Sequence, residues 1–129
     1  MCYHYLVSQP APWTIESFVD RQGRRPVDDW LNGLDAKDRT RIRRSLDLLR
    51  DYGIQLPMPY ARHLRGKQFE LRVQAGRRDY RVLYFAVVGR RMVLLHGFAK
   101  STQKTPAREI ETAERRMAEY QADQKEADR

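Results

Sequence analysis

Cysteine is almost absent from this chain of 129 residues, which has only Cys2. A single thiol cannot form an intramolecular disulfide or a thiolate metal cluster, and this fits a reducing cytoplasm. Long apolar runs are also lacking, since none reaches the roughly 18 residues that a membrane span needs. Residues 1–12 do not combine a basic start with an apolar stretch, so no secretory signal is indicated. These absences predict a cytoplasmic protein with no membrane partner.

Acidic residues are scarce relative to basic ones: 17 Asp and Glu face 25 Lys and Arg, for a formal net charge of +8 and a pI near 10.0. An excess of this kind favours a polyanionic partner, because each contact between a cation and a phosphate releases condensed counterions. Charge alone does not separate RNA from DNA or from a membrane surface.

The length and the 41% hydrophobic content are typical of one packed domain. We expect an extended leader over residues 1–12, where Pro10 and Pro12 disfavour helix. A single domain is expected over residues 13–120. The polar residues 121–129 are expected to form a frayed tail.

The first half of the chain carries one strand pattern and two helix patterns. Residues 13–19 alternate as in a strand, and Pro26 can open a short helix. Asp35 can cap a longer helix, which Gly53 ends. Residues 56–66 are interpreted as loop.

The second half predicts three strands, over residues 68–74, 79–88 and 91–100. Short loops at Gly76-Arg77 and Gly89-Arg90 make them an antiparallel meander. Thr105, as N-cap, and Pro106 open a final helix. The predicted fold class is therefore α+β, with an antiparallel sheet built from the N-terminal strand and the meander, two N-terminal helices packed on it, and a C-terminal helix.

The two tight loops also predict the register of the meander. They place Arg72 opposite Arg81, Glu70 opposite Leu83, Leu83 opposite His96, Arg81 opposite Phe98 and Asp79 opposite Lys100. One face should then meet the helices through Phe69, Leu71, Val73, Val82, Tyr84, Val93 and Leu95. The other, polar face should gather Glu70, Arg72, Arg81, His96 and Lys100.

Two arginines paired across strands repel each other, and an anion bound between them would remove the conflict. Cleavage of RNA by attack of the 2′-hydroxyl on the adjacent phosphate needs a base, an acid and fixed positive charge, but no metal or other cofactor. Arg72, Arg81 and Lys100 can supply the charge. His96 or Glu70 can transfer protons.

Simpler interpretations stand beside this one. Arg72 and Arg81 can merely pair with Glu70 and Asp79 on a solvated face. His96, within an apolar run, can be a structural residue.

Several strings in this region resemble a known family: Phe69-Glu70-Leu71-Arg72, Tyr80-Arg81-Val82-Leu83-Tyr84, Leu94-Leu95-His96-Gly97-Phe98-Ala99-Lys100 and Thr102-Gln103-Lys104-Thr105-Pro106. In this order and spacing they are similar to the phage-derived branch of the HigB/RelE toxin superfamily, over about residues 13–120. The resemblance implies a small α+β fold and ribosome-dependent cleavage of messenger RNA in the A site. It also implies contacts with ribosomal RNA and neutralisation by a cognate antitoxin, commonly a helix-turn-helix protein.

Carried over by position, Arg81 matches the arginine that family members use on the scissile phosphate, and Arg72 and Lys100 fall where other basic active-site residues lie. The RelE type has a lysine where this chain has Glu70, and its C-terminal tyrosine has no assigned counterpart here. The base is therefore left between His96 and Glu70. Lys104, Arg77 and Arg78 are expected to contact RNA.

Two further functions fit the same fold. A nucleic-acid-binding or regulatory module would need the charge but no acid or base. A protein-interaction partner would exist mainly to be held by an antitoxin. Because function belongs to the site, the fold does not choose among the three.

Overall fold

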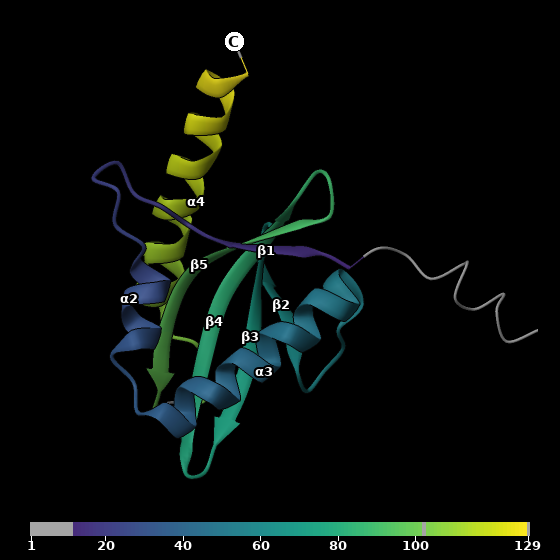
Figure 1. Ribbon diagram of the computed structural model, residues 1–129, viewed down its shortest axis with the longest axis vertical. Helices are drawn as coiled ribbons and strands as arrows, with labels where there is room; N and C mark the ends of the chain where they lie inside the picture. Colours follow the sequence, from purple (N-terminus) through teal and green to yellow (C-terminus); the bar gives the residue numbers. More distant parts are fainter. Residues whose placement is uncertain (1–11, 102, 129) are drawn as a thin grey trace, which may run out of the picture.

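The computed structural model describes residues 12–101 and 103–128. Their centre is a five-stranded sheet in the order β1-β5-β4-β3-β2 (Figure 1). The strands are β1 (Thr14–Ser17), β2 (Ala61–Arg65), β3 (Gln68–Ala75), β4 (Arg78–Val87) and β5 (Arg91–Lys100), and the helices are α2 (Pro26–Asn32), α3 (Ala36–Tyr52), the short 3₁₀ helix η1 (Gly53–Gln55) and α4 (Ala107–Ala127). The predicted α+β class, with two N-terminal helices and one C-terminal helix, is confirmed.

Helices cover both faces of the sheet. α2 and α3 pack on one face, against β5 and β3, and α4 packs on the other, against β5 and β4. The C-terminal part of α4 continues past the end of the sheet (Figure 1). α4 therefore covers much of the face that we expected to be polar.

α3 begins and ends where the sequence predicts. The Asp35 side chain accepts a hydrogen bond of 2.9 Å from the backbone N–H of Lys37, which satisfies one free donor of the first turn. Gly53 follows the last turn with φ of 57°, a conformation that favours glycine. The buried Tyr80 hydroxyl donates to the Asp38 carboxylate and so links the first turn of α3 to β4.

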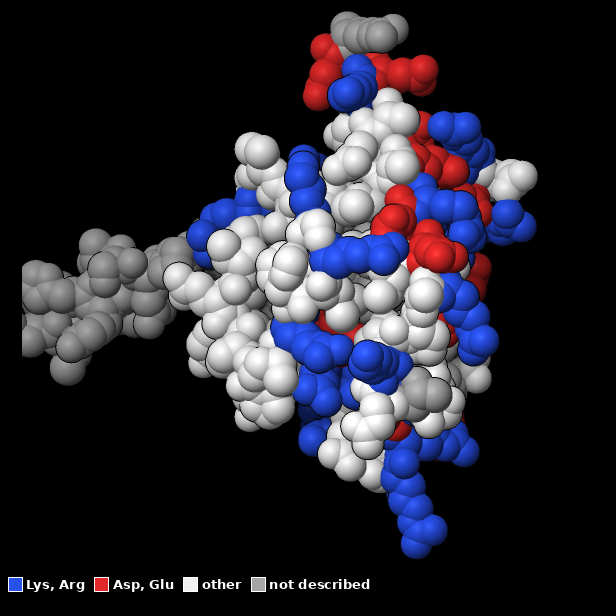
Figure 2. All heavy atoms as spheres, turned by 180° about the vertical axis from the view of Figure 1, so that it is seen from behind, with Lys and Arg blue, Asp and Glu red and all other residues white. Residues whose placement is uncertain are grey.

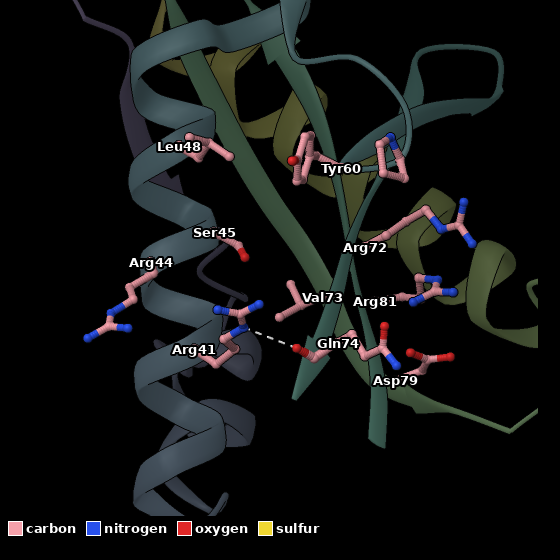
Figure 3. A pocket seen from close by; sticks show the side chains of 11 residues that line it. Arg41, Arg44, Ser45, Leu48, Tyr60, Arg72, Val73, Gln74, Asp79 and Arg81 are labelled. Carbon is pink, nitrogen blue, oxygen red and sulfur yellow. Dashed lines mark hydrogen bonds between the residues drawn. The ribbon is translucent and has the colours of Figure 1, made fainter. Parts of the chain in front are cut away.

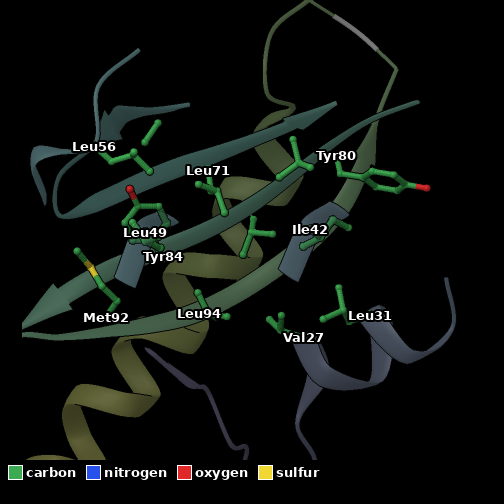
Figure 4. Packing of buried hydrophobic residues seen from close by; sticks show 13 residues of the cluster. Val27, Leu31, Ile42, Leu49, Leu56, Leu71, Tyr80, Tyr84, Met92 and Leu94 are labelled. Carbon is green, nitrogen blue, oxygen red and sulfur yellow. The ribbon is translucent and has the colours of Figure 1, made fainter. Parts of the chain in front are cut away.

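Two apolar clusters fill the spaces on either side of the sheet. The larger one lies beneath α2 and α3 (Figure 4), and its members include Val27, Leu31, Ile42, Leu49, Leu71, Val82, Tyr84, Met92 and Leu94. The smaller one lies beneath α4 and contains Phe18, Leu83, Phe85, Val93, Leu95, Phe98 and Ala113. Burial in the first cluster fixes the α3 side of the sheet, and burial in the second holds α4.

The predicted register of the meander is confirmed at all five pairs, including Arg72 opposite Arg81 and Asp79 opposite Lys100. The predicted faces are wrong at Val93 and Leu95, which point toward α4. The cause is a register shift after the pair of Leu83 with His96, since Tyr84 then pairs with Leu94. The extra residue in β5 exchanges the faces of the residues before it.

Two features of the sheet differ from the expectation. β1 pairs with β5 in parallel, so the sheet is mixed rather than wholly antiparallel. No tight turn joins β1 to the meander, and its direction therefore had no local signal. Residues 61–65, interpreted as loop, form β2, which pairs antiparallel with β3. Only this pairing organises the short, basic segment as a strand.

The last helix also differs at both ends. Pro106, not Thr105, occupies the N-cap position, and the Thr105 hydroxyl donates to Glu70 instead. The expected frayed tail is helical as far as Ala127. Most of the expected leader, residues 1–11, lies outside the described residues. No helix in the described part of the chain is long and apolar enough to cross a membrane.

Gly97 provides a test of the packing between α2 and β5. A Cβ at this position would lie 2.3 Å from the Trp30 ring, whereas a Cβ at Gly33 would meet nothing closer than 3.5 Å. We expect Gly97→Ala to lower the free energy of unfolding by about 1–3 kcal/mol through overpacking. Gly33→Ala should change it by less than about 0.5 kcal/mol. Urea unfolding of both variants checks this, and equal stabilities would contradict the packing.

Candidate functional site

The candidate site lies on the α4 side of the sheet, where β2, β3 and β4 bring charged residues together. The strand register places Arg62 opposite Glu70 and Arg72 opposite Arg81. Lys100, at the end of β5, lies opposite Asp79. On the side of the molecule seen in Figure 2, Lys and Arg gather in the lower half, whereas the upper part carries both signs of charge.

Glu70 is the centre of this cluster and is 0% exposed. Its Oε1 atom lies 3.3 Å from Nε of Arg62 and 3.3 Å from Nε of Arg81, and Thr105 donates to its Oε2 atom. Oε1 and the two Nε atoms are buried and form ion pairs without an aligned hydrogen bond among the described residues. One carboxylate is therefore shared by two guanidinium groups and offsets only part of their charge.

Arg81 is 3% exposed, and its Nη1 atom donates a 2.9 Å hydrogen bond to the carbonyl of Tyr80. Burial lowers the pKa of Arg81, and the neighbouring Glu70 carboxylate acts in the opposite direction. Arg81 nevertheless stays positively charged, because the guanidinium group does not lose its proton in proteins. Arg81 therefore lies on the expected face, but its guanidinium is buried there and its orientation is fixed by neighbours.

Positive charge exceeds negative charge within the cluster. The cations Arg62, Arg72, Arg81 and Lys100 interact with the carboxylates Glu70 and Asp79, which leaves a formal excess of +2 from four cations and two anions. Burial and then the charge of Arg81 lower the pKa of Lys100. A bound anion would relieve this repulsion, as the sequence predicts for Arg72 and Arg81.

His96 lies on the same face but is held by α4 rather than by the arginines. Its Nε2 atom lies 2.9 Å from Oε1 of Glu109, and its Nδ1 atom lies 3.1 Å from Nη1 of Arg116. Because guanidinium only donates, Nδ1 accepts and Nε2–H donates to the carboxylate. Leu83 lies between Glu70 and His96 in the row across the strands. The structure thus separates His96 from the predicted cationic group.

The remaining predicted residues lie at the margins. Arg77 is exposed in the turn between β3 and β4, and Lys104 is exposed in the connection from β5 to α4. Arg78 begins β4, and its Nη1 atom lies 3.5 Å from Oδ2 of Asp38. Among the described residues, no three His, Cys, Asp or Glu side chains are grouped as metal ligands.

Sequence reasoning missed Arg62 and Thr105. Arg62 lies on β2, which we interpreted as loop, and only its position opposite Glu70 reveals its role. Thr105 carries a typical N-cap signal, but its hydroxyl serves the buried carboxylate. The alternation of Arg62 with Ala61 is the one local signal that would have suggested a strand.

Arg72 and Arg81 also border an open cavity of about 550 Å³, which extends to α3 (Figure 3). Fold and site together define a class: small α+β proteins that hold a cationic cluster on a helix-covered sheet. The sequence narrows this class, because residues 29–118 match the family described as Phage derived protein Gp49-like (DUF891). The chain belongs to this family, which is toxin-like and related to RelE and HigB. No curated protein matches the chain.

Glu70 should contribute strongly to stability, because its removal leaves Arg81 buried without its carboxylate. We expect Glu70→Ala to lower the free energy of unfolding by on the order of 3 kcal/mol. The control is Glu114→Ala, which breaks an exposed pair with Arg65 and should cost less than about 1 kcal/mol. Chemical denaturation measures both, and a smaller loss for Glu70→Ala than for Glu114→Ala would refute the buried-pair description.

His96 should make stability depend on pH. Burial lowers its pKa below the usual value, although the hydrogen bond to Glu109 opposes this, while Arg116 and Arg115 add to it. The fold therefore favours the neutral ring, and its contribution is present above the ordinary pKa of histidine and lost as the pH falls. We expect Tm to drop from about pH 7.5 to about pH 5.5 more in the wild type than in His96→Gln. Parallel drops in thermal melts of the two proteins would argue against this assignment.

Proposed function

We propose that this protein is the toxin of a type II toxin-antitoxin system and cleaves messenger RNA in the ribosomal A site. The observation that carries the proposal is the pairing of Arg72 with the buried Arg81 in a cluster whose positive charge exceeds its negative charge. Membership of a toxin-like, phage-derived family supports the same conclusion. The reaction proposed is attack of the 2′-hydroxyl on the adjacent phosphate, without a metal. The bond from O2′ to phosphorus forms as the bond from phosphorus to O5′ breaks, the 2′-hydroxyl loses its proton and the leaving 5′-oxygen gains one, which gives a 2′,3′-cyclic phosphate and a 5′-hydroxyl.

In this proposal Arg81 binds the scissile phosphate. The phosphorane gains charge in the transition state, so a guanidinium that is already oriented stabilises it without reorganisation. Glu70 has both oxygens engaged, by Arg62 and Arg81 on one side and Thr105 on the other. We therefore assign Glu70 to positioning Arg81 rather than to proton transfer.

Proton transfer is assigned to Lys100. Burial and then the charge of Arg81 lower the pKa of Lys100, so its ammonium group gives up a proton more readily than that of an ordinary lysine. His96 is engaged on both ring nitrogens by Glu109 and Arg116, which favours a structural role. Arg72 supplies the second fixed charge beside the phosphate.

The partners that we propose follow from ribosome-dependent cleavage of messenger RNA by a toxin. The exposed Arg77, Arg78 and Lys104 would contact messenger or ribosomal RNA near the site. A cognate helix-turn-helix antitoxin would neutralise the toxin, and both would act in the cytoplasm, where the ribosome is. The excess of basic residues supports contacts with RNA.

The alternative is a nucleic-acid-binding or regulatory module on the same fold. The engagement of His96 and Glu70 by neighbouring side chains favours it, because a binder needs the cations but no proton-transfer group. Such a protein would bind RNA through Arg72 and Arg81 and leave it intact.

Substitution of the arginines tests their role in cleavage. We expect Arg81→Lys and Arg72→Ala each to slow cleavage by about a hundredfold, because neither variant keeps both two-pronged guanidinium contacts with the phosphate. Primer extension on a ribosome-bound message measures the rate. Arg24→Ala, which changes an exposed arginine paired with Asp20, is the control and should cleave normally.

Thermal melts accompany each variant, because Arg81 is buried and its replacement costs stability. A folded Arg81→Lys or Arg72→Ala variant that cleaves at the wild-type rate would exclude this residue as a phosphate ligand. A folded wild type that binds the message without cutting it would select the binding module.

A further inference from the structure

The edge of the sheet next to the arginines is open for a short distance. β2 pairs with β3 only from Ala61 to Arg65, and the bond from the backbone N–H of Arg72 to the carbonyl of Tyr60, 2.8 Å long, extends this pairing by one step. Beyond Arg72, residues 73–75 of β3 have no strand on this side in the described part of the chain. The backbone edge of β3 therefore borders a space rather than another strand.

α3 forms the opposite wall of this space. Arg41 reaches from α3 to β3, where its Nε donates 3.1 Å to the carbonyl of Gln74, and this bond closes one end (Figure 3). The resulting cavity has a volume of about 550 Å³, within the range of small-molecule sites. It continues around the edge of β3 to Arg72 and Arg81.

The lining is mixed in a way that suits a flat heteroaromatic ring. Leu48, Pro59, Tyr60 and Val73 present apolar surface, and Ser45 and Gln74 add groups that form hydrogen bonds. Tyr60 is 50% exposed, so its ring is available to a ligand. In Figure 3, Leu48 projects from α3 and Tyr60 lies on the side of β3 that faces this helix, while Arg72 and Arg81 extend on the other side of β3.

We propose that this cavity binds a nucleobase of the RNA strand whose phosphate lies on Arg72 and Arg81. The proposal rests on the proposed function for the identity of the ligand. Single-stranded RNA is recognised by bases that leave the stack and pack on aromatic rings while arginines hold the backbone. Here the ring and the arginines border one cavity, so a nucleotide bound to the cations would place its base against Tyr60.

The test compares ligands with and without a base. We expect a nucleoside 5′-monophosphate to bind the full-length protein about tenfold more tightly than ribose 5-phosphate, the gain typical of one stacked base. Amide chemical shifts followed by NMR give both affinities. The monophosphate should perturb Ser45, Tyr60 and Gln74, and ribose 5-phosphate should perturb Arg72 and Arg81 alone.

Variants of Tyr60 test the ring directly. Tyr60→Ala should lower affinity for the monophosphate to that for ribose 5-phosphate, and Tyr60→Phe should keep it, because stacking needs the ring and not the hydroxyl. Tyr52→Ala is the matched control, since Tyr52 is 54% exposed and lines a different cavity. Normal melting of Tyr60→Ala excludes a loss of fold as the cause.

Equal affinities for the two ligands, or an unchanged affinity in a folded Tyr60→Ala, would overturn the base site. The outcome for the enzyme is separate. If the arginine variants lose cleavage but no base-dependent gain exists, the ribonuclease stands and the base site falls. If the gain exists but the folded wild type binds the message without cutting it, the base site stands and the proposed ribonuclease falls.

Discussion

A carboxylate with no exposed surface, Glu70, holds two guanidinium groups on the sheet face that α4 covers. Neither Glu70 nor Arg81 would be stable there without the other, because an uncompensated buried ion costs several kcal/mol. The pair thus ties the position of Arg81 to the position of Glu70, and Thr105 ties both to the segment that leads into α4.

The covering of the α4 face is related to the same constraint. α4 packs on this face through Ala113, and Thr105, in the segment before the helix, donates a hydrogen bond to the buried Glu70. Glu109 and Arg116 hold the helix to His96. Stability and the proposed phosphate site consequently share residues, so a change that loosens α4 would also alter the surroundings of Arg81.

Local sequence signals predicted what local structure decides. The turns at Gly76 and Gly89 set the register of the meander, and Asp35 and Gly53 set the ends of α3. Long-range pairing decided the rest. Within residues 61–65 only the alternation of Ala61 with Arg62 hints at a strand, and pairing with β3 is what forms β2. The bulge in β5 moved Val93 and Leu95 to the other face.

For the candidate site, too, the sequence predicted the local arrangement and missed the long-range contacts. Strand register placed Arg72, Arg81 and Glu70 on one face, because that needs only the turns. Three features depend on elements that are distant in sequence, and residue spacing does not reveal them. They are the burial of Arg81, the ion pair of Glu70 with Arg62, and the contacts of His96 with Glu109 and Arg116 of α4.

The hydrogen bond from Arg41 to the carbonyl of Gln74 also limits pairing of the β3 edge with a strand of another molecule. An open strand edge invites pairing with a strand of another molecule, which leads to aggregation. By occupying this carbonyl, Arg41 removes one acceptor from an edge only three residues long, residues 73–75. The edge of β3 therefore stays accessible to a ligand but is a poor template for a strand of another molecule, because Arg41 of α3 occupies one of its hydrogen-bond acceptors.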